Sequence, residues 1–424
     1  MPLRQKRKST MSRKVLVIGA GPAGMMAAGA AAENGADVIL FEKNHVVGRK
    51  LAITGKGRCN ITNFCDTDEF IAHLTANPRF MYSAINQFSC YDTVAFFEER
   101  GLHTKVERGN RVFPESDKAA DVVDCLYDWL EENRVQILNK EVKGLILDDG
   151  AVKGVRLNDR EVFADAVIVT CGGLSYPATG STGDGYTFAK SAGHTITPLL
   201  PSLVPLVSDD GDVPELQGLS LKNIAIHVFD NNSDKEIYDD FGEMLFTHFG
   251  VSGPVILSAS AHMRQMSPNR YTIYIDLKPA LDDDTLEKRI LRDLSEFANK
   301  DIGNSLSKLL PKKLIPVVLN RAGIDPHTKC NNLTAEKRRA MLDVLKRFKV
   351  SIHSFRPIKE AVVTHGGVDV RDVDPRTMQS KLTRDLYFAG EVLDLDAYTG
   401  GFNLQIAYAT GRLAGTSAAL GSLW

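Results

Sequence analysis

The sequence predicts an α/β protein in which one domain with a parallel sheet is built from both ends of the chain and is interrupted by an insertion. Three observations lead to this expectation. The chain opens with an apolar run, a glycine-rich turn and an alanine-rich stretch. Apolar runs without polar alternation, which are typical of strands covered on both faces, recur at residues 166–170 and 386–388. Between these two runs, prolines and short β-like segments replace the earlier pattern after residue 200.

The first elements form a β-α-β unit, which is the pattern of a parallel sheet. Residues 15–18 form a strand, 22–33 form a helix after a glycine-rich turn, and 38–41 form a second strand. Residues 142–157 predict a hairpin, because Asp149-Gly150 separates two runs that contain β-branched residues. Further helices are expected at 66–87 (with breaks), at 91–100 and at 117–133.

The insertion divides into a β part and a helical part. Residues 201–280 are expected to be mainly antiparallel β, with strands at 203–207, 224–229 and 271–277. Residues 281–355 are expected to form a small helical domain, with Phe348 on the apolar face of its last helix. The parallel-sheet domain therefore comprises residues 1–200 and 356–424, and it ends in a helix at 402–420 that is rich in small residues.

Composition and charge narrow the classes of function. The 424 residues include 51 Lys and Arg against 53 Asp and Glu, a net charge of -2, so a nucleic-acid partner is not expected. No apolar run approaches the roughly 18 residues of a transmembrane helix, so no membrane partner is expected. The basic stretch at residues 4–14 precedes a run too short and too glycine-rich for a signal peptide, and is interpreted as a solvated tail.

The six cysteines show no CxxC spacing. Neither a zinc knuckle nor a redox dithiol is therefore expected, and free thiols in a reducing cytoplasm are the natural inference. Cys59 is interpreted as a buried or half-buried spectator thiol. No cluster of His, Asp and Glu has metal-ligand spacing, so no metal is expected.

The strongest local signal is a glycine fingerprint between the first strand and the first helix. Its GxGxxG pattern consists of Gly19, Ala20, Gly21, Pro22, Ala23 and Gly24. The first glycine permits a tight turn, the second lets a pyrophosphate approach the backbone, and the third lets helix and strand pack closely. The helix N-terminus offers free N–H groups to the phosphates. Because Glu42 follows at the end of the second strand, where it can accept hydrogen bonds from both ribose hydroxyls, the pattern predicts a Rossmann-like dinucleotide site that disfavours NADP.

Three further segments favour FAD over NAD. The polar and basic stretch at residues 47–63 is longer than a NAD dehydrogenase needs, whereas an extended FAD needs such a cradle. Glu391 places an acid at the end of a strand, where it suits the ribityl or pyrophosphate region. The run Gly400–Leu404 then opens the last helix, and its N–H groups are expected to face the N1–C2=O2 edge of the flavin. Two consecutive glycines in this run would let the backbone pass close to the flat ring.

These residues resemble the bacterial family of NAD(FAD)-utilising dehydrogenases, often called BaiN-like NAD(P)/FAD-dependent oxidoreductases. The resemblance implies noncovalent FAD and a two-piece Rossmann-like FAD-binding domain, with a β domain and a small helical domain inserted. It covers nearly the whole chain. The stretches that carry it are VLVIGAGPAG, GRKLAITGKGRCNITN, TCGGLSYPATGSTGDGY, PSLVPL, LFTHFGVSGPVIL, AVVTHGGV and FAGEVLDLDAYTGGFNLQIAYATG.

The resemblance also implies which residues touch FAD. Val142 is expected to meet the adenine through its backbone. Cys171 stands where Ala or Ser is more usual, and its small thiol is expected to fit. Besides the fingerprint at 19–24, the expected FAD-binding residues are Glu42, Lys43, Arg49, Lys50, Asn60, Val142, Thr170, Cys171, Gly172, Gly390, Glu391, Gly401, Phe402, Asn403 and Leu404.

Together these features predict an FAD-dependent oxidoreductase that moves a hydride between flavin N5 and a small or medium organic substrate. Reduction of a conjugated C=C bond is the preferred form. An amine oxidase that uses oxygen and an FAD-containing, RNA-associated protein are the alternatives. No second GxGxxG lies between residues 60 and 420, so either NAD(P)H binds transiently or the substrate itself supplies the electrons. His248, His365 and Tyr398 are candidates for acid–base or substrate-facing roles, but no catalytic residue is assigned, and the oligomeric state is not predicted.

Overall fold

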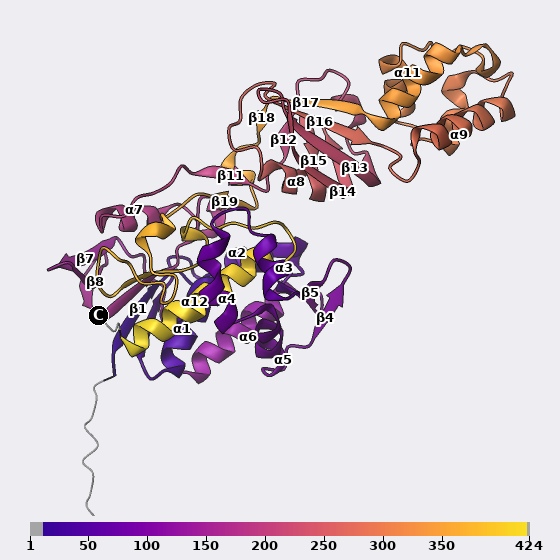
Figure 1. The fold of residues 1–424 in the computed structure, drawn as a ribbon. Helices are drawn as coiled ribbons and strands as arrows, with labels where there is room; N and C mark the ends of the chain where they lie inside the picture. The colour runs from indigo at the N-terminus through magenta and orange to yellow at the C-terminus, as the bar shows by residue number, and fades with distance from the viewer. Residues whose placement is uncertain (1–11, 422–424) are drawn as a thin grey trace, which may run out of the picture. The chain divides into compact units, whose positions relative to one another are not determined.

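The computed structural model describes residues 12–421, which divide into two compact units (Figure 1). Unit 1 combines the residues up to Leu200 with those from Val362 onward, and unit 2 comprises Pro201–Ala361. Of the basic N-terminal segment only Arg13 and Lys14 lie among the described residues, so the expectation of a solvated tail falls mostly outside them.

Unit 1 is built on a five-stranded sheet in the order β20-β10-β1-β2-β6. Each neighbouring pair is parallel, and the C-terminal strand β20 pairs with β10 beside the N-terminal strands. Both ends of the chain therefore form one sheet, which confirms the predicted fold class. The strands are β1 (Lys14–Ile18), β2 (Asp37–Phe41), β6 (Gln136–Leu138), β10 (Ala166–Val169) and β20 (Leu386–Phe388).

Helices and two small antiparallel sheets surround this sheet. The predicted hairpin is present, and Asp149 and Gly150 at its tip both have positive φ, at 47° and 66°. The helices are α1 (Pro22–Glu33), α2 (Arg49–Ile53), α3 (Thr67–Ala72), α4 (Tyr82–Gln87), α5 (Cys90–Glu98), α6 (Ala119–Glu132), α7 (Asp184–Ser191) and α12 (Phe402–Leu420). The small sheets are formed by β3 (Thr62–Asn63), β5 (Arg111–Pro114) and β4 (Thr104–Glu107), and by β7 (Gly144–Asp148), β8 (Ala151–Arg156) and β9 (Glu161–Phe163).

Unit 2 contains a seven-stranded sheet in the order β17-β16-β13-β14-β15-β12-β18, in which all neighbours are antiparallel. Helix α11 packs on α9 and α10, and it also contacts β16 and β17. The strands are β12 (Leu206–Val207), β13 (Ser220–Asp230), β14 (Lys235–Thr247), β15 (Gly250–Ser252), β16 (Tyr271–Asp276), β17 (Phe348–Ile352) and β18 (Ser354–Phe355). The helices are α8 (Pro254–Ser260), α9 (Asp283–Glu296), α10 (Ile315–Arg321) and α11 (Ala335–Lys346).

Three expectations for unit 2 differ from the structure. The strand expected at 203–207 shrinks to β12, because Leu203 has a φ of 56° and Pro205 interrupts the run. Phe348 does not lie on a helix but begins β17, which pairs with β16 after the helices and returns the chain to the sheet. The 13-residue strand β14 was not predicted, because its exposed face carries acidic residues that obscure the alternation.

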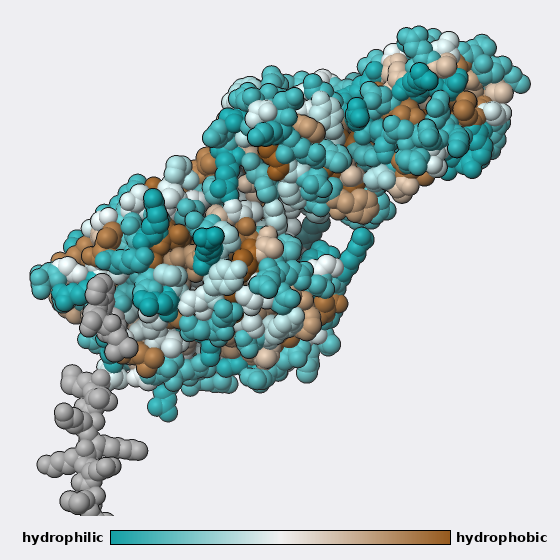
Figure 2. All heavy atoms as spheres, in the orientation of Figure 1, coloured by the Kyte–Doolittle hydropathy of each residue, from teal (hydrophilic) through white to brown (hydrophobic). Residues whose placement is uncertain are grey.

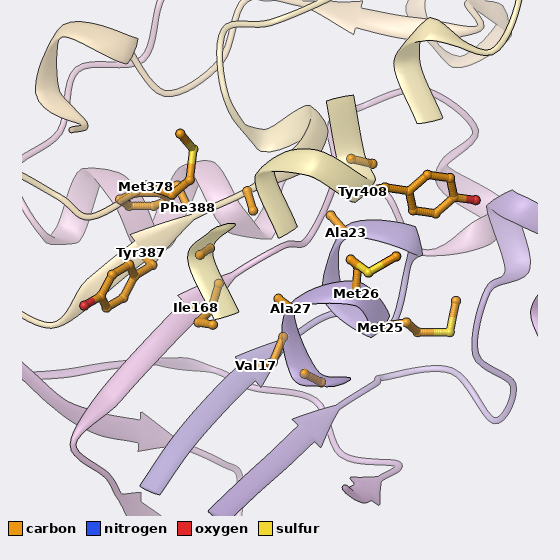
Figure 3. Close-up of a cluster of buried hydrophobic side chains, with 14 of the residues drawn as sticks. Val17, Ala23, Met25, Met26, Ala27, Ile168, Met378, Tyr387, Phe388 and Tyr408 are labelled. Atoms are coloured by element: carbon orange, nitrogen blue, oxygen red, sulfur yellow. The ribbon is translucent and has the colours of Figure 1, made fainter. Parts of the chain in front are cut away.

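The core of unit 1 depends on a close contact between α1 and α12, which also both pack on β1 and β10. A Cβ on Gly411 would lie 2.4 Å from Ala23 O, and a Cβ on Gly415 would lie 2.1 Å from Ala27 O. Figure 3 shows Ala23, Ala27 and Tyr408 in this cluster of buried side chains. The small residues expected in the last helix thus let two backbones touch.

The visible face of each unit is mostly polar (Figure 2). Figure 2 shows hydrophilic residues over most of the visible face, with apolar residues in small patches. Among residues 12–421, no helix is both long enough and apolar enough to cross a membrane.

We expect Gly415→Ala to destabilise unit 1, because the added methyl would overlap the carbonyl oxygen of Ala27. Forcing such a group into a packed contact costs about 1–3 kcal/mol. Urea unfolding followed by circular dichroism would measure the loss. Gly144→Ala is the matched control, since a Cβ there meets only Arg156 Nη1 at 3.8 Å. Equal unfolding midpoints for the two variants would contradict the assigned contact.

Candidate dinucleotide-binding site

The fingerprint turn lies at the carboxyl end of β1, where the order of the parallel sheet changes direction. From β1 the sheet continues to β2 and β6 on one side and to β10 and β20 on the other. Ligands of open α/β sheets bind outside the carboxyl ends of the strands at such a reversal. The fold therefore places Gly19–Gly24 where a dinucleotide would be expected.

Two fingerprint glycines are required by the packing of the protein itself. Gly19 has a φ of 102°. A Cβ on Gly24 would lie 1.8 Å from Gly19 O and 2.6 Å from Thr170 Oγ1. The Thr170 hydroxyl, at the end of β10, donates to Gly19 O at 2.8 Å. These residues let the turn, β10 and α1 meet closely, which is the role that the pattern predicts for them.

Gly21 differs, because the described part of the protein does not require it to be glycine. Its φ of -79° and ψ of -177° suit any residue. A Cβ at Gly21 would have no heavy atom within 4 Å beyond its chain neighbours. The residue is the N-cap of α1, so the open space lies directly before the helix N-terminus. That arrangement fits a pyrophosphate, whose oxygens accept hydrogen bonds from the free N–H groups at the helix N-terminus.

Glu42 is buried at the end of β2, and its carboxylate is already partly used. Oε2 accepts the Ala20 N–H at 2.9 Å. Oε1 accepts both the backbone N–H and the side-chain amide of Asn44, at 2.8 and 2.7 Å. Since a carboxylate has about four lone-pair sites, one remains for a ribose hydroxyl. The second predicted hydroxyl contact requires Asn44 to release Oε1.

Near Glu42, two basic residues were expected to touch the cofactor. In the structure, their side chains form hydrogen bonds or ion pairs with protein groups. Lys43 Nζ lies 2.7 Å from Asp184 Oδ2, at the start of α7. Arg49 Nη1 donates to Asn44 Oδ1 at 2.8 Å. Both side chains hold loops around Glu42, so a direct contact with a cofactor would require them to exchange partners.

A half-buried ion pair joins four segments that are distant in sequence. Lys50 Nζ lies 2.7 Å from Glu391 Oε2 and 2.6 Å from Ser175 Oγ. Glu391 Oε1 accepts from the Thr364 N–H and from Ser175 Oγ, both at 2.9 Å. Sequence reasoning identified Lys50 and Glu391 but missed Ser175 and Thr364. Both lie in stretches that carry the family resemblance, and that is the signal that could have found them.

Two buried amide oxygens after α2 have no hydrogen-bond partner among the described residues, namely Asn60 Oδ1 and Asn63 Oδ1. The other side-chain atom of Asn63, Nδ2, donates to Gly109 O at 3.0 Å and to Gly400 O at 3.1 Å. An unsatisfied buried polar group costs about 1–3 kcal/mol. These oxygens are therefore positions at which a donor from outside the protein is expected.

The glycines before α12 have a role in the packing of the protein itself. Gly400 and Gly401 have φ of 123° and 99°. A Cβ on Gly401 would lie 2.3 Å from the carbonyl carbon of Thr62 in β3. The backbone of Thr62 already requires a glycine at this position, so Gly401 is not evidence for a flat ring, and its contact with a cofactor stays a prediction.

The first residues of α12 are largely occupied by protein contacts. Phe402 is buried and stacks on His73, with 4.3 Å between ring centroids. The side chain of Asn403 accepts from Ala397 N at 3.0 Å and donates to Ala397 O at 2.7 Å. Leu404 is partly buried against the core. What this segment offers a cofactor is therefore its backbone N–H groups.

The remaining predicted positions, Gly172, Gly390 and Val142, all belong to unit 1. The Gly390 N–H donates to Thr410 Oγ1 at 2.9 Å, and a Cβ on Gly390 would lie 2.7 Å from the Cβ of Ala23 in the fingerprint. A Cβ on Gly172 would meet Ser181 Oγ at 3.0 Å. Val142 is buried in the core next to the hairpin.

Among the thiols of unit 1, Cys59 is buried and Cys171 is half-buried. Burial raises the pKa of Cys59 to about 12 and that of Cys171 to about 12, so both are spectators at neutral pH. The Cys171 thiol fits its position and lies 3.5 Å from Ile18 O. Sequence spacing did not indicate that Cys65 and Cys90 are neighbours, yet the structure places their sulfur atoms 3.9 Å apart.

The candidate acid–base residues lie in different surroundings. His365 Nδ1 lies 2.9 Å from Asp396 Oδ1. The Tyr398 N–H donates to His73 O at 3.1 Å. His248 is exposed in unit 2, beside Phe249. Within residues 12–421, no group of three or more His, Cys, Asp or Glu is arranged to hold a metal ion.

Comparison with known proteins defines the class first. The model of the family "HI0933-like protein Rossmann domain" matches residues 13–417. The chain belongs to this family. It is 31% identical over 413 residues to a 3-dehydro-bile acid delta(4,6)-reductase from Clostridium scindens, covering 96% of this chain and 99% of the relative. It is 30% identical over 396 residues to a ribosomal RNA dihydrouridine synthase from Escherichia coli, covering 93% of this chain and 95% of the relative.

Among solved structures, the chain is similar to a 3-ketosteroid delta1-dehydrogenase from Sterolibacterium denitrificans. The TM-score is 0.50 at 13% identity, covering 96% of this chain and 100% of the other, which shows a shared fold. The family resemblance inferred from the sequence is confirmed, and so is the expected enzyme class, a flavin-dependent oxidoreductase.

We expect Cys59 and Cys171 to resist alkylation in the folded protein. Because burial raises the pKa of each to about 12, both stay protonated at any pH well below that value, and the thiolate is the nucleophile. Iodoacetamide labelling near neutral pH, followed by peptide mass spectrometry, should be at least about 100-fold slower than labelling of a free cysteine. The guanidinium-unfolded chain is the control, in which both sites should label readily. Rapid labelling in the native state would contradict the burial.

Proposed function

We propose that the chain binds FAD along the carboxyl ends of β1, β2 and β10. The observation that carries this proposal is Gly21, because the protein itself does not require a glycine at this N-cap of α1. A pyrophosphate explains its presence, since any side chain would occupy the pyrophosphate path. The unpartnered buried oxygen of Asn60 supports the proposal independently.

Different residues of unit 1 would bind different parts of FAD. When bound, FAD supplies hydride chemistry. The N-terminus of α1 would take the pyrophosphate, and the free capacity of Glu42 would take a ribose hydroxyl. The Lys50–Glu391 pair would face the ribityl region. The first N–H groups of α12 would face the pyrimidine edge, and Asn60 Oδ1 would accept a donor from the cofactor.

We further propose that the enzyme reduces a C=C bond conjugated to a carbonyl group, with NAD(P)H as a transient electron donor. The support is a chemistry shared by two relatives, a 3-dehydro-bile acid delta(4,6)-reductase and a ribosomal RNA dihydrouridine synthase. Each name denotes saturation of a C=C bond that is conjugated to a carbonyl group. Hydride adds to the far carbon of such a bond, and a proton adds to the carbon nearer the carbonyl. Amine oxidation has no comparable support.

A steroid-like enone is the first substrate class, because the sequence predicts a small or medium organic substrate and one relative is a bile acid reductase. A uridine in ribosomal RNA is the second candidate, and a charge pattern favours it. Residues 300–349 include twelve Lys and Arg against four Asp and Glu, a local excess that the near-neutral whole chain conceals. Arg339 on α11 and Arg347 just after it are exposed. Such a basic surface suits a phosphate backbone.

We expect Gly21→Val to fold normally and yet fail to bind FAD. The backbone angles at this position are allowed for valine, and its side chain would point into open space in the protein. It would, however, block the pyrophosphate. Wild-type protein should release FAD on heating, whereas the variant should be colourless with an unfolding midpoint equal to that of the FAD-free wild type. Gly24→Val is the contrast, because its side chain clashes with Gly19 O and should impair folding itself. A Gly21→Val protein with normal FAD content would contradict the assigned position.

The substrate class can be tested by oxidation of the reduced enzyme. After anaerobic reduction with NADPH or NADH, we expect a 3-oxo-4,6-diene bile acid to restore the oxidised flavin spectrum rapidly. A ribosomal RNA transcript should do so only if uridine is the substrate. In that case Arg339→Glu with Arg347→Glu should weaken the RNA reaction at least about tenfold and reduce its salt dependence. Lys153→Glu, an exposed charge reversal in β8 of unit 1, is the control.

A further inference from the structure

One histidine in unit 1 is held by a buried carboxylate. His365 ends β19 (Val363–His365), and its Nδ1 lies 2.9 Å from Oδ1 of Asp396. The Asp396 side chain is 0% exposed, whereas that of His365 is 16% exposed. An ionised carboxylate only accepts hydrogen bonds, so the ring nitrogen that faces it carries the proton. The dyad therefore fixes the ring orientation and leaves Nε2 on the opposite edge.

Nε2 of His365 has no hydrogen-bond partner among the described residues, and it is not one of their buried unsatisfied atoms. Here one nitrogen is committed to a buried charge and the other is open to the surroundings. This is the arrangement in which a carboxylate orients an imidazole and stabilises its protonated form for proton transfer.

Both residues of the dyad adjoin, in sequence, groups that we propose to hold the flavin. Thr364, the residue before His365, donates its N–H to Glu391 at 2.9 Å. Asp396 lies between Glu391 and the start of α12, and the next residue, Ala397, is clamped by the Asn403 side chain. Two consecutive residues of β19 are thus joined to the segment that connects the ribityl-facing acid to the flavin-facing helix end.

We propose that His365 is the proton donor in the reduction, with Asp396 as its positioning residue. The proposal rests on the proposed function and deepens it. The far carbon of the conjugated bond receives a hydride, which carries two electrons from the reduced flavin, and the C=C π bond breaks. The carbon nearer the carbonyl then takes the proton from Nε2 of the imidazolium. The resulting neutral imidazole recovers a proton from water, so atoms and charges balance.

Reoxidation of the reduced enzyme separates this role from a structural one. Dithionite-reduced protein would be mixed anaerobically with the 3-oxo-4,6-diene bile acid, with the ribosomal RNA transcript, or with ferricyanide, which takes electrons and needs no proton delivered to carbon. We expect His365→Gln to retain FAD and to react with ferricyanide at the wild-type rate. Its reaction with the substrate that oxidises the wild type should be about 10²–10⁴-fold slower, the usual contribution of a general acid. His227→Gln is the control, since that histidine pairs with Glu236 on the exposed surface of β13 and β14.

A second measurement does not depend on turnover. In FAD-free protein labelled with ¹⁵N-histidine, long-range ¹H–¹⁵N NMR should show the neutral His365 ring with its proton on Nδ1. Asp396→Asn should lose this tautomer preference and slow the substrate reaction at least about tenfold. Equal substrate rates for His365→Gln and wild type, or a proton on Nε2 in the neutral ring, would overturn the proposal. Failure of both substrates to oxidise the wild-type enzyme would overturn the proposed reduction itself and the donor role with it.

Discussion

The close approach of α1 and α12 is the constraint on which the rest of unit 1 depends. Gly411 and Gly415 have no side chains, so the backbone of α12 touches the carbonyl oxygens of Ala23 and Ala27. Because α1 begins at the fingerprint and α12 begins at the turn after Thr399, this contact aligns two helix N-termini from opposite ends of the chain. An extended dinucleotide needs two such ends, one for its pyrophosphate and one for its ring. The positions of both helix ends therefore depend on the contact between the helices.

The pairing of β20 with β10 explains why the polar part of the site is composite. Once β20 is placed beside β10, Glu391 follows at the carboxyl end of the sheet and meets Lys50, 341 positions earlier. Thr364 and Ser175 then satisfy the second carboxylate oxygen. No one of these segments forms the network alone. An insertion of the size of unit 2 is tolerated because both segments that flank it belong to unit 1.

Sequence reasoning could predict features that depend on local spacing. The strand, glycine turn and helix at residues 14–33, the Asp149-Gly150 hairpin and the last helix all follow from short-range rules. It could not predict that Asn44 donates hydrogen bonds to Oε1 of Glu42, or that the thiols of Cys65 and Cys90 are neighbours. Such contacts depend on the path of loops in the folded chain, which short-range spacing does not determine. It also misplaced Phe348. This apolar residue continues the periodic pattern of the preceding amphipathic helix, but in the structure it belongs to a strand that pairs with β16.

Gly21 and Gly401 show how a structure separates two reasons for the same residue. Both were assigned to the cofactor because a missing side chain brings a backbone close to a ligand. For Gly401 the close neighbour is the backbone of Thr62, so the fold alone accounts for the glycine. For Gly21 the backbone angles are ordinary and no described atom is near, so the fold does not account for it. A glycine that the protein does not need, placed before a helix N-terminus, points to a molecule that is not part of the chain. That is why the argument for a bound pyrophosphate depends on Gly21 rather than on the whole fingerprint.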